Sequence, residues 1–86
     1  MTEKQIEQKL CLKVKALGGM AIKINSLSMS GLPDRLILLP EGKALFVELK
    51  APGKKMRLIR VKRKRQLEKL GFLVYCIDDI NRLKKY

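Results

Sequence analysis

The chain has 86 residues, a length that allows one small domain with a thin core rather than several domains. Its 20 Lys and Arg residues against 8 Asp and Glu give a net charge of +12, and no stretch reaches the roughly 18 apolar residues of a membrane span. We therefore expect a soluble protein with a polyanionic partner. Nucleic acid is the commonest such partner for a compact basic domain; an anionic membrane surface or a ribonucleoprotein scaffold stays open on charge alone.

The chain opens without the features of an export or transit signal, so we expect it to act in the cytoplasm. Cys11 and Cys76 have no CxxC spacing, and the sequence contains no His. We therefore expect two reduced, buried thiols rather than a disulfide or a zinc site. Residues 1–86 are predicted to form a single domain.

A first helix is predicted from about Glu3 to Leu17. Thr2 and Gln5 have the spacing of a capping box, and Gly18 follows the last helical residue. The apolar positions of this helix recur every three or four residues and form one stripe: Ile6, Leu10, Val14 and Leu17. Alternating residues at 20–25 then predict a strand, and a small polar loop follows at 26–31.

Two apolar strands joined by a tight turn come next. The segment Leu39–Lys43 contains a Pro that presets φ and a Gly that accepts the left-handed conformation, as in a three-residue hairpin loop. If Leu39 pairs with Lys43, then Asp34 falls opposite Glu48. Directly paired residues share a face of the sheet with Cβ atoms about 5 Å apart, so both carboxylates could bind one divalent ion.

Two like charges side by side on apolar strands repel each other, and a bound cation removes that conflict. A few hard oxygen ligands suit Mg²⁺ or Mn²⁺ better than zinc. Lys50 follows on the same face as Glu48, because strand side chains alternate with period 2. A metal ion, an activated water and a nearby ammonium can hydrolyse a phosphodiester. The alternative is an exposed strand pair with incidental charges.

A second helix is predicted from about Met56 to Leu70, with Gly71 closing it. It carries a basic run at 62–65, which is either a phosphate-binding surface or a solvated face. The loop serines could also bind phosphate oxygens, although serines are common in loops. The candidate nucleic-acid contacts are Ser28, Ser30, Lys54, Lys55, Lys62, Arg63 and Arg65.

Two further polar residues are candidates for the site. Glu7 sits beside the apolar stripe of the first helix, where it is either a third carboxylate or a solvated residue paired with a lysine. Gln66 is predicted on the inner, apolar side of the second helix, because it is spaced from Ile59 and Leu70 by helical repeats. It would either point at the acidic pair or occupy a boundary position.

The last part of the chain begins with an apolar run. Phe72–Ile77 predicts a central strand covered on both faces. Asp78 and Asp79 are predicted to cap a short final helix through Tyr86 rather than to form a metal site.

The order helix, three strands, helix, strand, with Pro33-Asp34 followed by Glu48-Leu49-Lys50, resembles the PD-(D/E)xK nuclease superfamily. More closely, the chain is similar to the virus-type replication-repair nuclease (VRR-NUC) family in three places: Gly31-Leu32-Pro33-Asp34, Glu48-Leu49-Lys50-Ala51-Pro52 and Gln66. The similarity covers nearly the whole chain. It implies an α/β fold, with a restriction-endonuclease-like αβββαβ core and a mixed central sheet flanked by helices, in a stand-alone domain of viral or phage type.

The resemblance also implies roles for the motif residues. Asp34 and Glu48 would bind Mg²⁺ or Mn²⁺, and the backbone carbonyl of Leu49 would be a further ligand. Lys50 would position or deprotonate the attacking water and stabilise negative charge.

The remaining candidates and the activity follow from the same family. Glu7 matches its helix-1 glutamate and Gln66 its helix-2 glutamine. The expected activity is structure-selective cleavage of branched or flap DNA, similar to that of Holliday-junction resolvases, by a homodimer without a small-molecule cofactor. The alternative is a non-catalytic basic nucleic-acid-binding protein with the same fold. Sequence-specific restriction would need more base-reading surface than so short a chain offers.

Overall fold

A computed structural model describes residues 2–51 and 53–78 of the chain. The elements follow the predicted order of helix, three strands, helix and strand. They are α1 (Glu3–Ala16), β1 (Met20–Lys23), β2 (Arg35–Leu39), the 3-10 turn η1 (Pro40–Gly42), β3 (Lys43–Leu49), α2 (Leu58–Lys69) and β4 (Leu73–Ile77). The αβββαβ core is therefore confirmed. Within the described residues, none of the helices is long and apolar enough to cross a membrane.

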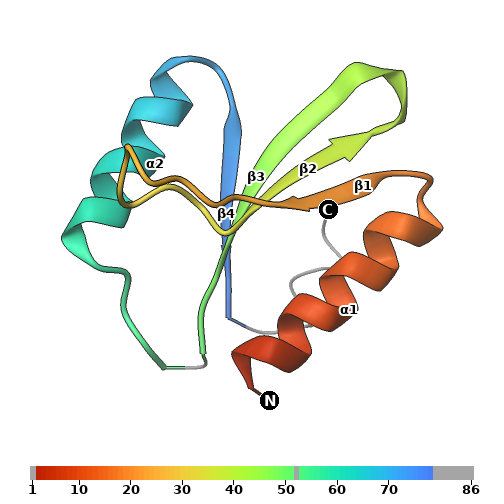
Figure 1. Ribbon diagram of the computed structural model, residues 1–86, viewed down its shortest axis with the longest axis horizontal. Coiled ribbons are helices and arrows are strands. Elements are labelled where there is room, and N and C mark those ends of the chain that lie inside the picture. The colour runs from red at the N-terminus through yellow and green to blue at the C-terminus, as the bar shows by residue number, and fades with distance from the viewer. Residues whose placement is uncertain (1, 52, 79–86) are drawn as a thin grey trace.

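The four strands form one mixed sheet in the order β1-β2-β3-β4. The first two pairings are antiparallel, and β3 pairs with β4 in parallel. A parallel pair needs a crossover connection, and α2 supplies it. The two helices lie on opposite sides of the sheet, with α1 on one side and α2 on the other (Figure 1). A mixed sheet flanked by helices is thus confirmed.

The start of α1 has the capping box that the sequence predicts. The Thr2 hydroxyl accepts a hydrogen bond from the Gln5 N–H at 3.2 Å, and the Gln5 side-chain oxygen accepts one from the Thr2 N–H at 2.8 Å. The helix ends at Ala16, and Gly18 follows with a φ of +83°. Such a left-handed residue lets the chain turn sharply into β1.

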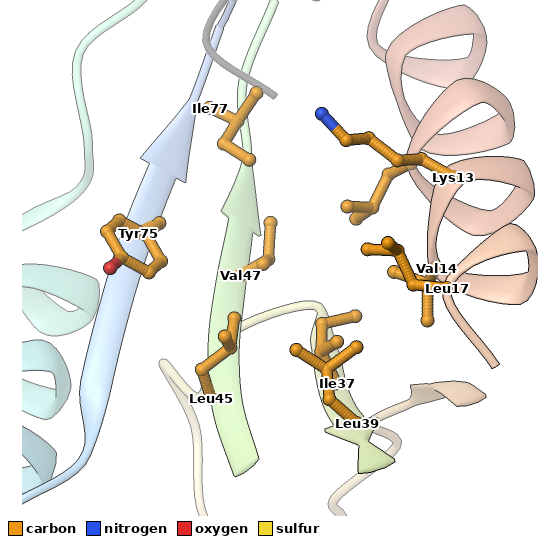
Figure 2. Close-up of a pocket in the computed structure, with 10 residues that line it drawn as sticks. Lys13, Val14, Leu17, Ile37, Leu39, Leu45, Val47, Tyr75 and Ile77 are labelled. Carbon is orange, nitrogen blue, oxygen red and sulfur yellow. The ribbon is translucent and has the colours of Figure 1, made fainter. Parts of the chain in front are cut away.

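The apolar core lies between α1 and the sheet. Side chains at alternate strand positions point toward the helix, as the period of 2 requires. Figure 2 shows Val14 of α1 facing Ile37 and Val47 across a small apolar cavity. The buried members of this core are Ile6, Leu10, Val14, Ile37, Val47, Leu49 and Ile77.

The hairpin between β2 and β3 has the predicted register. Leu39 pairs with Lys43 at the turn, and Arg35 pairs with Val47 at the other end. One step beyond that last pair, Asp34 comes opposite Glu48. The turn uses two left-handed residues, Glu41 as well as the expected Gly, and closes as a 3-10 turn.

Several predictions of the last third of the chain need correction. The segment predicted as a central strand is an edge strand, since β4 has a described neighbour only in β3. Leu73 is accordingly 57% exposed, and the apolar run reflects packing by Val74 and Ile77. Cys11 and Cys76 are thiols rather than disulfide partners, as expected, but they are only half-buried. The predicted helix from Asp79 to Tyr86 lies outside the described residues.

Candidate active site

Two carboxylates meet at one end of the central hairpin. Asp34 directly precedes β2, and Glu48 is the penultimate residue of β3. Val47 and Leu49 on either side of Glu48 pack in the core against α1, so Glu48 points to the opposite face, toward α2. Glu48 is 3% exposed, and among the described residues it is the polar or charged side chain that is buried. Asp34 accepts a hydrogen bond through Oδ2 from the Leu49 N–H at 2.8 Å, which fixes one carboxylate against the neighbouring strand.

A guanidinium from α2 lies against this acidic pair. Arg60 Nη1 is 2.5 Å from Glu48 Oε1 and 3.5 Å from Asp34 Oδ1. The same nitrogen donates a hydrogen bond to the carbonyl oxygen of Leu32 at 3.1 Å. The repulsion expected between the two acids is therefore balanced by a residue of the chain itself. The sequence places Arg60 in the basic second helix, but no local pattern pairs it with the acids.

Burial dominates the electrostatics of Glu48. It raises the pKa of that carboxyl from 4.5 to about 7, the Arg60 hydrogen bond opposes the rise, and Asp34 adds to it. The hydrogen bond to Glu48 in turn raises the pKa of Arg60. A carboxyl that exchanges its proton near neutral pH, beside a second acid in a polar pocket, is typical of functional sites.

The acidic pair opens into a polar pocket of about 330 Å³, several times the volume of one water molecule. Basic side chains dominate its wall. The charged residues that line it are Glu3, Asp34, Glu48, Lys50, Lys54, Lys55, Arg57 and Arg60. The structure thus brings together Asp34, Glu48 and Lys50 as predicted, with two of the predicted nucleic-acid contacts beside them. Lys50 Nζ donates a hydrogen bond to the Lys55 carbonyl, which orients the ammonium along the wall.

Glu7 lies elsewhere. Its Oε2 is 3.2 Å from Nε of Arg35, whose Nη1 also donates to the Ala21 carbonyl at 3.1 Å. Arg35 follows Asp34 directly and so points to the opposite, α1 face of the sheet. The acid of α1 that lines the pocket is Glu3, in the first turn of the helix. Its position next to the N-terminus of the chain offers no sequence signal of this proximity.

Gln66 lies one helical repeat after Ile59 but is not buried, so the prediction of an inner, apolar position is wrong. Its side chain is exposed and accepts a hydrogen bond from Arg63 Nη1 at 2.8 Å. Leu70, which the spacing argument used to define the inner side, is itself 74% exposed. The residues of α2 that contact the loop before Asp34 are Ile59 and Arg60, in its first turn.

The remaining nucleic-acid candidates fall into two groups. Lys62 and Arg65 are exposed on α2, and Ser28 is exposed in the loop. Arg63 is already engaged, because its Nε donates to the Ser30 carbonyl at 2.8 Å and so holds the loop against α2. Arg63 and Ser30 therefore shape the loop as well as contributing to the polar surface.

The donor set suits a hard divalent cation. In the part of the chain that the structure describes, no cluster of three or more His, Cys, Asp or Glu side chains could hold a metal. The carboxylates of Asp34 and Glu48 instead meet in one pocket, which Leu49 also lines. Mg²⁺ keeps several waters and commonly uses one or two carboxylates, whereas a zinc site needs three or four protein ligands. The residues present fit Mg²⁺ or Mn²⁺.

Known proteins are similar to this chain in fold and in sequence. A solved structure described as a VRR_NUC domain matches with a TM-score of 0.90, over 99% of this chain and 94% of that one, at 26% sequence identity. The protein "Putative nuclease p44" of Acyrthosiphon pisum secondary endosymbiont phage 1 is 42% identical over 76 residues, which are 88% of this chain and 82% of the phage protein. The chain belongs to the VRR-NUC family. No family model matches the sequence.

The VRR-NUC assignment confirms the resemblance carried by the Pro-Asp and Glu-Leu-Lys motifs, and it places the chain in a nuclease family. Both motifs contribute to the pocket of this VRR-NUC domain, through Asp34, Glu48 and Lys50. Its fold is therefore the α/β nuclease fold that the element order predicts.

Proposed function

We propose that this VRR-NUC protein is a divalent-metal-dependent, structure-selective DNA endonuclease that hydrolyses phosphodiester bonds. Branched or flap DNA is the proposed substrate, with cleavage similar to that of Holliday-junction resolvases. The observation that carries the proposal is the meeting of Asp34 and Glu48 with Lys50 in one open pocket walled by basic side chains. Membership in a nuclease family supports the hydrolytic reaction.

Each residue of the pocket has a separate role in the proposed hydrolysis. Asp34, Glu48 and the Leu49 carbonyl would hold Mg²⁺ or Mn²⁺, which supplies a Lewis acid for the phosphate and lowers the pKa of an attacking water. Lys50 positions that water and stabilises negative charge as the reaction proceeds. Lys54 and Lys55 bind phosphate oxygens at the pocket wall, where their charges attract the DNA backbone.

The other site predictions have indirect parts in this scheme. We propose that Glu7 acts through Arg35, which adjoins Asp34. Gln66 would act through Arg63, which holds the loop leading to Asp34. Ser28, Lys62 and Arg65 would extend the phosphate contacts.

A homodimer fits the proposed substrate. Paired cuts across a symmetric junction need two sites related by a two-fold axis, and a dimer with an isologous interface supplies that symmetry.

We propose the cytoplasm as the place of action.

One observation favours a second candidate function, a non-catalytic nucleic-acid-binding protein. The acidic pair already has a counter-ion in Arg60, so the fold can be stable without a metal. The basic surface would then serve for binding alone.

A single assay separates the two functions. Purified protein is incubated with linear, flap and four-way-junction DNA, with Mn²⁺ or with EDTA, and the products are resolved on native and denaturing gels. A nuclease produces new DNA ends with Mn²⁺, most of all from the branched substrates, and Asp34→Ala shifts DNA without cutting it. Mobility shifts without new ends from the unmodified protein would establish the binding protein instead. Cleavage by purified Asp34→Ala would remove the acidic pair from the mechanism.

A further inference from the structure

One nitrogen atom touches both acids of the candidate site. Arg60 Nη1 lies 2.5 Å from Glu48 Oε1 and 3.5 Å from Asp34 Oδ1. The other oxygen of Asp34, Oδ2, already accepts the hydrogen bond from the Leu49 N–H. Nη1 thus contacts one oxygen of each acid, and these two oxygens could jointly face a shared cation.

We propose that Arg60 is a built-in counter-ion that occupies the shared position of the acidic pair and withdraws from it when a divalent cation binds. This inference rests on the proposed metal site. Arg60 thereby sets how tightly the protein holds its metal.

Charge and distance require the withdrawal. A divalent cation held by both acids would need the space beside their oxygens that Nη1 fills. Two cations so close in a partly buried site repel each other strongly. The metal and the guanidinium are thus alternative partners of the same two oxygens.

The two states are both accessible to this chain. Without a metal, an unpaired Glu48 at 3% exposure would carry a buried charge, and the guanidinium relieves that cost. The Arg60 side chain is 31% exposed and lines the open pocket, so it can turn toward water without disturbing the core. The Leu32 carbonyl accepts a hydrogen bond from the same nitrogen, which favours the state in which Arg60 contacts the acids.

Metal binding by Arg60→Met measures the competition. The dissociation constant for Mn²⁺ is obtained from the electron paramagnetic resonance signal of free Mn²⁺ at pH 8.5. If Arg60 is withdrawn from the two acids in about a tenth of the metal-free molecules, removing its guanidinium tightens Mn²⁺ binding about tenfold. Arg57→Met is the matched control, because Arg57 lines the same pocket and, within the described residues, forms no ion pair with either acid. Its loss should change the dissociation constant by no more than about twofold.

The outcomes separate this inference from the proposed function. One outcome would overturn the counter-ion role alone. In it, Asp34→Asn weakens Mn²⁺ binding, but Arg60→Met binds Mn²⁺ no more tightly than the unmodified protein does. Mn²⁺ binding that is equally weak in the unmodified protein and in Asp34→Asn would overturn the metal site and the inference together.

A second measurement follows Arg60 in the unmodified protein and does not depend on Arg60→Met. The Nε–Hε signal of Arg60, assigned by comparison with Arg60→Lys, is followed by nitrogen-15 magnetic resonance during titration with Mg²⁺. The inference predicts a shift that saturates with the metal and faster exchange of the Nε proton with water. A signal that stays in place while Mg²⁺ saturates the site would refute it, even if Arg60→Met fails to fold.

Discussion

Glu48 on β3 and Arg60 on α2 form an ion pair of 2.5 Å that joins the sheet to the helix in the wall of the pocket. The acid is buried and the guanidinium is partly exposed. The pair couples the stability of the fold to the chemistry of the site, because the same carboxylate is the proposed metal ligand.

The first prediction concerns stability against pH in the absence of metal. The folded pKa of Glu48 is about 7, above its ordinary value of 4.5, so the folded protein binds this proton more tightly than the unfolded chain does. The contribution to the free energy of unfolding is present at low pH and is lost as pH rises from about 4.5 to about 7, by up to about 3 kcal/mol. Urea unfolding in EDTA from pH 4.5 to 8.5 measures it. Glu48→Gln should flatten this part of the profile; parallel profiles would contradict the assignment.

The second prediction concerns Lys50→Met. Lys50 lines the same pocket as the acidic pair, and removing a group that stabilises transition-state charge costs about a hundredfold or more in rate. We expect cleavage to fall by that factor while Mn²⁺ affinity stays within about threefold. Lys43→Met is the control, since Lys43 is exposed at the hairpin end of β3. Equal losses in the two variants would assign the effect to general charge.

The third prediction concerns the loop before Asp34. Gly31 has a φ of +81°, and a Cβ there would lie 2.8 Å from the Ile59 side chain and from its carbonyl oxygen. Gly42 has a φ of +73° with open space around it. Gly42→Ala should cost about 1–2 kcal/mol from the left-handed backbone alone. Gly31→Ala should cost more and slow cleavage, because the loop must move away from α2. Equal unfolding free energies for the two variants would show that Ile59 moves away from the added methyl group at no energetic cost.

The fourth prediction concerns Glu7→Gln. The Glu7–Arg35 pair is partly exposed, at 27% and 16% for the two side chains, so its loss should cost about 1 kcal/mol or less in urea unfolding. A positioning role predicts slower cleavage with unchanged Mn²⁺ affinity. Double replacement with Arg35→Met should then slow cleavage no further than either change alone. Weaker Mn²⁺ binding by Glu7→Gln would make it a third ligand instead.

Local sequence chemistry determined much of this protein. The Thr2–Gln5 capping box and the register of Leu39 with Lys43 follow from residues close together in the chain. Continuing that register along the two strands brings Asp34 opposite Glu48. Backbone hydrogen bonding and turn geometry act over a few residues, so such features can be read without knowing the rest of the fold.

Tertiary packing decided the partners of the charged side chains. The second helix is basic around much of its circumference, so its sequence has no apolar stripe that fixes its rotation against the sheet. Docking of α2 brings Arg60 to the acids and leaves Gln66 exposed. The apolar run of β4 could not reveal an edge position either, because burial by helices does not report how many strands lie alongside. The hairpin sequence was therefore enough to predict the acidic pair. The position of its counter-ion, Arg60, depended on contacts between elements far apart in the chain.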